Sequence, residues 1–390
     1  MEKEPGFIRM QILRTGQEKT LDTLLPLFSF VKGGTAEKES GHFLFQVLEE
    51  QMPLAAYAGR DGFCLSTESM PEYEKLIRME GMDEKYTGDL LEVEEAREEA
   101  LLEENKKAAQ QLMAGENMTE TEGGKQDWKG APTQKQVLYP LEEYQEYEKL
   151  IGEFYTIDPT TMADETLFNL DDLLKRDMTL KDPGDGPQIL IYHTHSQEGF
   201  ADSVPGDESM TVVGVGDYLT ELLQERYGFK VLHHKGQYDV EKRDYAYAKA
   251  APALEQLLKD NPSIQVVIDL HRDEVPEGTR LLTTLNGKPT ARFMFFNGLS
   301  RTKKTGEIPY LENPYIEDNL AFAFQMQLAC NEYYPGLTRK IYLKGYRYNM
   351  HYCPKTLLVE LGAQTNTVEE AYNACEPLAD MIAKVLLGEE

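Results

Sequence analysis

Short, mainly apolar runs alternate with amphipathic stretches along the second half of the chain. Three of these runs, at 188–192, 264–270 and 356–362, are typical of strands covered on both faces. Helical patterns separate the runs, at 210–223, 241–259, 315–332 and from 367 onward. Strands that alternate with helices predict an α/β domain at 185–390, with a mixed, mostly parallel sheet flanked by helices.

Local signals mark the ends of several elements. The pair Asn286-Gly287 between two apolar arms predicts a β-hairpin. Gly228 stands where a glycine commonly ends a helix, and Thr367 with Glu370 has the spacing of a capping box for the last helix. Two shorter runs are further strand candidates, at 230–232 and 340–343.

The first half of the chain divides by composition into three regions. We predict a small module of mixed structure at 1–78, an acidic helix and flexible linker at 79–136, and a lead-in of two helices at 137–184. The end of the linker is polar, with almost nothing to bury, so it is expected to be solvated.

No segment near the N-terminus has the length of a membrane span. The longest apolar stretch there, at 24–31, is far shorter than the roughly 20 residues that a transmembrane helix needs. The first ten residues also lack the basic and apolar regions of a secretory signal. The pattern favours a soluble, unexported protein, and leaves open that an anchor or signal was removed or that the start lies upstream.

The composition is acidic and poor in cysteine. Among 390 residues, 40 Lys and Arg face 68 Asp and Glu, which gives a formal net charge of −28. A surface of this charge repels phosphate backbones, which argues against nucleic acid as a partner. Four cysteines are too few for a disulfide scaffold, and because they include no CxxC pair a thiolate zinc cluster is not expected either; they are Cys64, Cys330, Cys353 and Cys375.

Polar residues occur where three of the predicted strands end. His193, His195 and Glu198 follow the first strand, His271 ends the second, and Glu360 interrupts the third. Ligands of open α/β sheets collect beyond the carboxyl ends of the strands, and two imidazoles with one carboxylate are a known catalytic zinc set. We therefore predict a Zn²⁺ ion held by His195, Glu198 and His271. His193 is the alternative to His195, because alternate strand residues share a face.

Glu360 is a carboxylate within an otherwise apolar strand. Burying a charge costs several kcal/mol unless it is paired, so this residue needs a partner or a function. One interpretation is a salt bridge to Arg272, Arg292 or Lys344. The other is a general base beside the metal, which takes a proton from the attacking water and delivers it to the leaving nitrogen.

Further residues near the strand ends have supporting roles in this hypothesis. Asp269 and Asp273 flank His271, and either one would fix the tautomer of that ring or serve as a turn residue. Arg272 would pair with Glu198 or clamp a substrate carboxylate, which makes it a second candidate catalytic residue. The sequence does not decide between these two roles of Arg272.

Two other features are less specific. His233-His234 has no carboxylate partner at a useful spacing, so we interpret these two residues as surface residues. The aromatic segment YRYNMHY, next to Lys344, would either line the binding site of an extended ligand or form a packed loop.

Five motifs occur in order over about residues 150–390: ILIYHTHSQEGF, VVIDLHRD, ARFMFF, YPGLTRKIYLKGYRYN and LLVELGAQTNTVEEA. Together they resemble the stage II sporulation protein P family, which is similar to zinc-dependent N-acetylmuramoyl-L-alanine amidases. The segment FYTIDPTT at 154–161 resembles the part that leads into that domain. The first 140 residues carry no such resemblance.

The resemblance implies an amidase-like, three-layer catalytic domain. Its activity would be hydrolysis of the amide between muramic acid and the first alanine of the peptidoglycan stem peptide, together with endopeptidase cutting of cross-links. Family members act at the engulfing membrane during sporulation, anchored and extracytoplasmic, with a glycan-cleaving partner, stage II sporulation protein D. This chain departs from the family in showing no anchor at its start.

The resemblance also implies roles for individual residues. The zinc ligands would be His195, an acidic residue and His271, and the late catalytic residue would be Glu360. The acidic ligand is the open choice, since Asp207 and Glu208 compete with Glu198 for that place.

Two other functions fit the same residues. A zinc carboxypeptidase or N-acyl amino acid hydrolase would use a similar HxxE motif with a distant histidine. A non-catalytic module that binds the cell wall would need none of the chemistry at Glu360.

Overall fold

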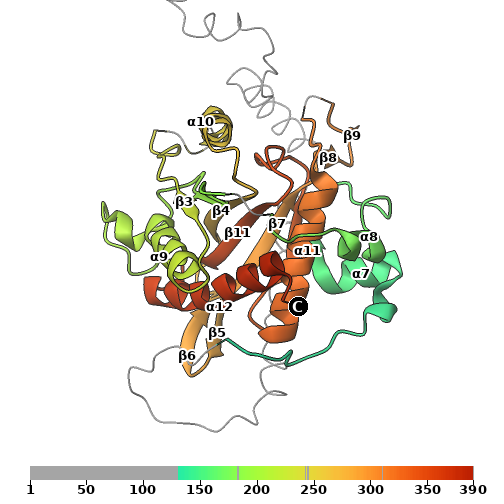
Figure 1. Ribbon diagram of the computed structural model, residues 1–390, viewed down its shortest axis with the longest axis horizontal. Coiled ribbons are helices and arrows are strands. Elements are labelled where there is room, and N and C mark those ends of the chain that lie inside the picture. Colours follow the sequence, from blue (N-terminus) through green and yellow to red (C-terminus); the bar gives the residue numbers. More distant parts are fainter. Residues whose placement is uncertain (1–130, 182–183, 242, 244–245, 310, 390) are drawn as a thin grey trace, which may run out of the picture. The chain divides into compact units, whose positions relative to one another are not determined.

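A seven-stranded sheet forms the centre of the computed structural model, which describes residues 131–181, 184–241, 243, 246–309 and 311–389 (Figure 1). The strand order is β1-β10-β7-β11-β4-β2-β3. The strands are β1 (Tyr155–Ile157), β2 (Ile189–Tyr192), β3 (Val231–His233), β4 (Val266–Asp273), β7 (Phe293–Gly298), β10 (Ile341–Lys344) and β11 (Thr356–Ala363).

Only one neighbouring pair in this sheet is antiparallel. Strand β11 runs antiparallel to β7 and parallel to β4, and every other pair is parallel. The predicted mixed, mostly parallel sheet is therefore confirmed. Because β2, β4 and β11 run in the same direction, their carboxyl ends lie at the same end of the sheet. Glu360 lies opposite His271 in the register there.

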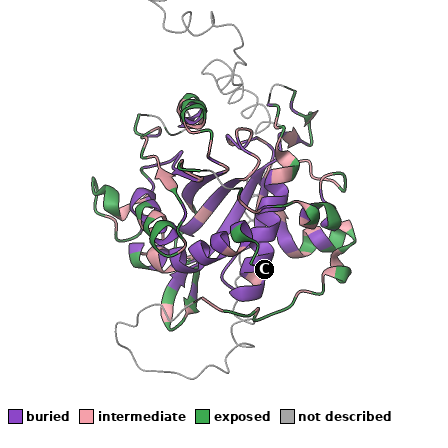
Figure 2. Ribbon diagram, in the orientation of Figure 1, coloured by how far each residue is buried: buried purple, intermediate pink, exposed green. Residues whose placement is uncertain are grey.

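Helices cover both faces of the sheet, which gives three layers. Helices α9 (Val212–Glu225), α11 (Ile316–Tyr333) and α12 (Val368–Leu387) bury one face against strand residues such as Ile191 and Val359. Helix α10 (Ala246–Asp260) covers the other face, where it packs on residues that include Leu190. Figure 2 shows the central strands buried between these layers.

The predicted local signals are confirmed. The hairpin of β5 (Leu282–Leu285) and β6 (Lys288–Ala291) turns at Asn286 and Gly287, with φ of 52° and 76°, as a two-residue hairpin turn requires. The capping box of Thr367 and Glu370 opens α12. Gly228 has φ 72° just after α9. A second small hairpin pairs β8 (Arg301–Thr302) with β9 (Gly306–Glu307).

The lead-in differs from the two predicted helices. It contains α7 (Tyr147–Phe154) and α8 (Leu170–Lys175), but residues 155–157 form strand β1, which pairs with β10 at the edge of the central sheet. The prediction of helix there was wrong, because pairing with β10 and packing of Tyr155 on Phe324 outweigh a weak local pattern. Two short 3₁₀ turns also occur among the described residues, η1 (Leu141–Tyr144) and η2 (Glu208–Met210).

Two further predictions concern the N-terminal regions and membrane-spanning segments, and the described residues cover them only in part. The N-terminal module at 1–78, and the linker up to residue 130, lie outside them. Within the described ranges, no helix combines the length and the apolar character needed to cross a bilayer.

Candidate metal and catalytic site

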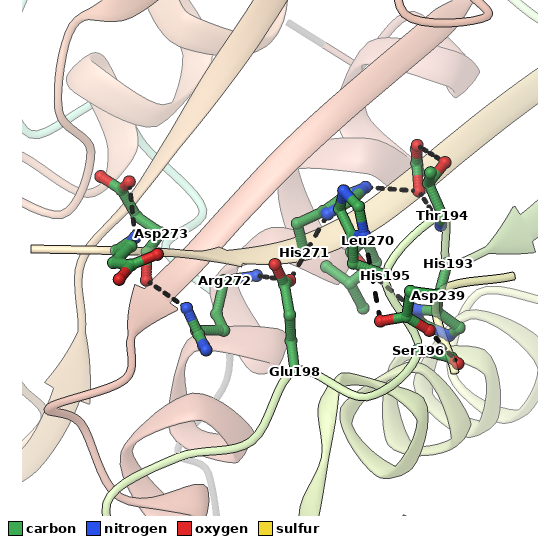
Figure 3. A network of polar contacts seen from close by, with 12 residues as sticks. His193, Thr194, His195, Ser196, Glu198, Asp239, Leu270, His271, Arg272 and Asp273 are labelled. Carbon is green, nitrogen blue, oxygen red and sulfur yellow. Dashed lines mark hydrogen bonds and ion pairs between the residues drawn. The ribbon is translucent and has the colours of Figure 1, made fainter. Parts of the chain in front are cut away.

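The carboxyl ends of β2 and β4 bring two of the predicted histidines together (Figure 3). His195 lies in the loop after β2 and His271 lies on β4. Their ring centroids are 5.3 Å apart, with an angle of 76° between the ring planes. Both side chains are buried. The strand order therefore places side by side two residues that are far apart in the sequence.

His271 lies between two carboxylates. Its Nε2 atom is 2.7 Å from Oδ1 of Asp269, and its Nδ1 atom is 3.4 Å from Oε2 of Glu198. Burial lowers the pKa of His271, but the charges of Asp269 and Glu198 outweigh it and hold the pKa well above the usual value. Asp269 is itself fixed by Thr194, whose backbone N–H and hydroxyl both donate to its carboxylate.

Glu198 is the acidic residue that reaches the histidines. Its Oε1 atom accepts a hydrogen bond from Nη2 of Arg243 at 2.6 Å, and its Oε2 atom accepts one from the backbone N–H of Arg272 at 3.0 Å. Burial raises the pKa of Glu198, but His271 and Arg243 outweigh burial and lower it. Glu198 is therefore held as a carboxylate.

The competing acids do not reach the histidines. Asp207 and Glu208 are exposed, and Asp207 caps the short turn η2 by accepting from the N–H and hydroxyl of Ser209. Of the three acidic candidates, only Glu198 is buried beside His271.

His195 presents a neutral imidazole to the site. Burial, together with the charges of His271 and Arg243, lowers the pKa of His195 to about 3. Its Nδ1 atom is buried without a hydrogen bond and lies 3.9 Å from Oδ2 of Asp239. A neutral ring has a lone pair available for a metal ion.

Glu360 has no partner among the described residues. Its Oε2 atom is buried and accepts no hydrogen bond. Burial raises the pKa of Glu360 to about 8, with His271 lowering it and the charges of Asp273 and Glu198 raising it further. A carboxyl group in this state is able to exchange a proton near neutral pH.

The predicted salt-bridge partners of Glu360 make other contacts. The Arg272 guanidinium donates to the carbonyl oxygens of Gly199 and Asp273. The Arg292 guanidinium donates to the carbonyl oxygens of Gly336 and Thr338. Neither arginine neutralises Glu360.

Lys344 lies at the end of the sheet opposite to the candidate site. It ends β10, where it pairs in register with Gly298 of β7. Because β10 and β7 run opposite to β11 and β4, the end of β10 is level with the amino ends of the strands that carry the site. The structure therefore does not bring Lys344 to the candidate site.

The two carboxylates that flank His271 in sequence have separate roles. Asp269 contacts the ring, whereas Asp273 accepts from Nη1 of Arg339 at 2.7 Å. Both carboxylates and His271 share one face of β4, as alternation along a strand requires. Asp273 thus acts on Glu360 only through its charge.

His193 turns away from the other histidines of the site. Its Nδ1 atom is 2.8 Å from the carbonyl oxygen of Leu270, and its Nε2 atom is 2.8 Å from Nε2 of His233. His233 also contacts Asp217, and its side chain is only 6% exposed. The interpretation of His233 as a surface residue was therefore wrong, because α9 and β2 enclose it.

Sequence reasoning missed three residues near the site. Two lie in the segment that joins β3 to α10, and the third lies in the first turn of α10. Asp239 and Arg243 contact His195 and Glu198 as described, and the Tyr247 ring lies 5.6 Å from the ring of His195. No motif connects these residues to the strand ends, so no sequence signal could have found them.

The donor set has the chemistry of a zinc site, and two of its spacings can be compared with those of such a site. In the part of the chain that the structure describes, no three His, Cys, Asp or Glu side chains form a ready-made ligand set. With bonds of about 2.0–2.1 Å in tetrahedral zinc, however, two ligand atoms lie about 3.4 Å apart and two imidazole centres about 5 Å apart. The values observed here, 3.4 Å between Glu198 and His271 and 5.3 Å between the two rings, match that spacing.

The chain is similar to proteins of known family. One curated relative, stage II sporulation protein P of Bacillus subtilis (strain 168), is 27% identical over 251 residues, which are 57% of this chain and 59% of the relative. The match thus spans about three-fifths of the length of that relative.

Two amidases are among the solved structures that this chain matches. An N-acetylmuramoyl-L-alanine amidase from Clostridium difficile 630 is 13% identical, with 53% of this chain and 97% of the other covered and a TM-score of 0.33. The amidase Ami1 from Mycobacterium smegmatis is 14% identical, with 55% and 100% covered and a TM-score of 0.31.

The family comparison covers most of the chain. The family described as Stage II sporulation protein P (SpoIIP) matches residues 48–383, and this span includes the lead-in, every strand of the central sheet and all of the candidate site residues. The match begins at residue 48, so the expectation that the first 140 residues carry no resemblance was wrong from that residue onward. The chain therefore belongs to the stage II sporulation protein P family.

Proposed function

We propose that this chain is a peptidoglycan hydrolase of sporulation that cleaves the amide between N-acetylmuramic acid and L-alanine, and also cuts peptide cross-links. The observation that carries the proposal is the meeting of His195, Glu198 and His271 at one sheet edge, beside the unpartnered carboxylate of Glu360. Family membership supports the sporulation context.

In this proposal His195, Glu198 and His271 would hold Zn²⁺. A bound zinc ion would polarise the scissile carbonyl and lower the pKa of the attacking water. The chain's own contribution is to keep two of these residues, Glu198 and His195, in the state that a metal ligand requires. Arg243 and the Arg272 backbone N–H hold Glu198 as a carboxylate, and burial keeps His195 neutral.

Glu360 is the proposed general base and acid. It takes one proton from water as the water oxygen forms a bond to the carbonyl carbon. It then gives that proton to the amide nitrogen as the carbon–nitrogen bond breaks, which leaves a carboxyl group and an amine. Support for this role comes from the absence of any hydrogen-bond partner at Oε2 among the described residues.

Arg272 has a narrower role here than the predicted clamp on a substrate carboxylate. Its backbone N–H holds Glu198, and its side chain ties the segment after His195 to β4 through Gly199. We propose that Arg272 positions the metal ligand. The guanidinium of Arg243, which is about half exposed beside Glu198, is then the cation placed to meet an anionic substrate.

The substrate of this reaction sets the proposed location. Peptidoglycan is extracytoplasmic, so we propose that the active protein works outside the cytoplasmic membrane. A glycan-cleaving partner of the stage II sporulation protein D type stays a prediction from the family resemblance.

Release of stem peptides from purified sacculi tests the proposed function. The full chain should release peptides bearing a free L-alanine amine, a chelator should stop the release, and added zinc should restore it. No release, or release that is indifferent to chelation, would reject the zinc amidase. Hydrolysis of small acylated amino acids without any action on sacculi would point instead to an N-acyl amino acid hydrolase.

A further inference from the structure

The connection between β3 and α10 places a buried carboxylate behind His195. Asp239 is 9% exposed, although its neighbours on the connection are open to solvent, with Val240 59% exposed and the Glu241 side chain 85% exposed. Burying a charged group costs several kcal/mol unless other groups compensate for it. The burial of Asp239 therefore requires an explanation, whereas its exposed neighbours require none.

The contacts of Asp239 are directed at the segment that carries His195. Its Oδ1 atom accepts from the hydroxyl of Ser196 at 3.0 Å, and its Oδ2 atom accepts from the backbone N–H of Gln197 at 3.1 Å. The same Oδ2 atom lies 3.9 Å from Nδ1 of His195. Two hydrogen bonds thus fix a carboxylate beside a ring nitrogen that is buried and has no hydrogen bond.

The other histidine of the site has the same arrangement. His271 has the Asp269 carboxylate 2.7 Å from its Nε2 atom, while its Nδ1 atom faces Glu198. In metal sites the ligating imidazole almost always donates its second N–H to a carboxylate, carbonyl or water, which fixes the tautomer and the ring orientation. His195 therefore has a carboxylate where such a partner is expected.

We propose that Asp239 is the positioning residue of His195: it accepts the Nδ1 proton of the ring and so turns the Nε2 lone pair toward the site. The inference rests on the proposed zinc function. A separation of 3.9 Å exceeds a hydrogen bond, so the ring turns toward Asp239 by about 1 Å when its Nε2 atom is engaged. Asp239 acts through His195 and does not touch substrate.

Zinc affinity of the full chain, measured by competition with a chelator, tests the assignment. Asp239→Asn should bind zinc about 10 to 100 times more weakly than the wild type. Glu241→Gln, two residues further along the same connection, should bind like the wild type. Ser196→Ala removes one anchor of the Asp239 carboxylate but leaves the carboxylate itself, so its affinity should fall by less than threefold.

The tautomer of His195 gives a second measurement that needs no metal. In the metal-free wild type, ¹⁵N NMR of the histidine rings should show the proton of His195 on Nδ1, and Asp239→Asn should shift protons toward Nε2. A merely structural role of Asp239 would not move this signature.

The outcomes separate this inference from the proposed function. Zinc affinity of Asp239→Asn within threefold of the wild type would overturn the role of Asp239 and leave the zinc site standing. A wild type with its His195 proton on Nε2 would overturn it as well, even if the variant failed to fold. A wild type that binds no zinc would overturn the proposed function, and the tautomer would still decide for or against Asp239.

Discussion

At the scale of single residues, Glu360 is the residue on which turnover is expected to depend. Glu360→Gln removes the proton acceptor and keeps the shape of the side chain, so we expect activity on sacculi to fall by about 10²- to 10⁴-fold. Zinc content should be unchanged, because Glu360 is not among the proposed ligands.

The matched comparison for this variant is Glu274→Gln, a change of another glutamate near the end of β4. It should retain most of the activity. Sacculus hydrolysis at the wild-type rate by Glu360→Gln would instead favour a module that binds the wall without catalysis.

The pKa of Glu360 also predicts a pH dependence of stability in chelator-treated protein. The raised pKa, about 8 against 4.5, means that the folded chain keeps a proton that the unfolded chain loses between these values. Stability relative to Glu360→Gln should therefore fall as the pH rises from about 4.5 and level off above about 8, by roughly 3–5 kcal/mol in total. Urea unfolding of both proteins at pH 5 and pH 9 measures this difference, and an equal gap at both values would contradict the buried, unpaired carboxyl.

His271 is expected to be essential for metal binding. His271→Ala removes the ring that lies between Glu198 and Asp269, so the purified variant should contain little zinc by elemental analysis. His234→Ala is the control, because His234 contacts Tyr238 and lies outside the proposed ligand set. Wild-type zinc content in His271→Ala would exclude His271 as a ligand.

At the scale of elements, the register of β11 and β4 decides where Glu360 lies. The two strands pair in parallel so that Glu360 is opposite His271. A slip of β11 by one residue would turn Glu360 to the other face, against α11 and α12, while His271 on β4 stayed in place. The apolar residues on either side of Glu360, Val359 and Leu361, are fully buried in that other face and so specify the register.

The capping box of α12 provides an element-scale prediction. The Thr367 side chain accepts from the N–H of Glu370, and the Glu370 carboxylate accepts from the N–H of Thr367. Thr367→Ala should lower the free energy of unfolding by about 1 kcal/mol. Thr367→Ser keeps the hydroxyl and should stay within a few tenths of the wild type, and equal losses in both variants by urea unfolding would argue against the cap.

At the scale of the whole molecule, the lead-in is part of the same packed core as the candidate site's sheet. Phe154 is fully buried, with its ring centroid 5.0 Å from that of Phe324 on α11. Phe154→Ala should therefore cost about 3–5 kcal/mol of stability, although it lies outside the predicted catalytic domain of 185–390. Zinc content at low temperature should not change, since β1 lies at the edge of the sheet remote from β2 and β4.

Glu148→Ala, an exposed change on the same helix, is the control for that prediction and should alter stability by no more than about 0.5 kcal/mol. An equally small effect of Phe154→Ala would mean that the lead-in is only loosely attached to the sheet.

The sequence by itself determined most strands of the central sheet but not β1, together with the hairpin, the last helix cap and the placement of His195, His271 and Glu360 in or after predicted strands. These signals are local: apolar runs identify strands that are covered on both faces, and the polar residues stand directly at their ends. The alternation of strands with helices also predicted that the sheet is mostly parallel.

Only the tertiary structure decided which acid lies beside the histidines, which contacts His193 makes, at which end of the sheet Lys344 lies, and which residues support His195 and Glu198. Glu198 was separated from Asp207 and Glu208 by the path of the loop after β2, which no residue pattern records. Asp239 and Arg243 reach the site from a connection some 40 residues away in sequence. The physical reason is that loop paths depend on hydrogen bonds and packing between distant segments, whereas strand periodicity depends on neighbours.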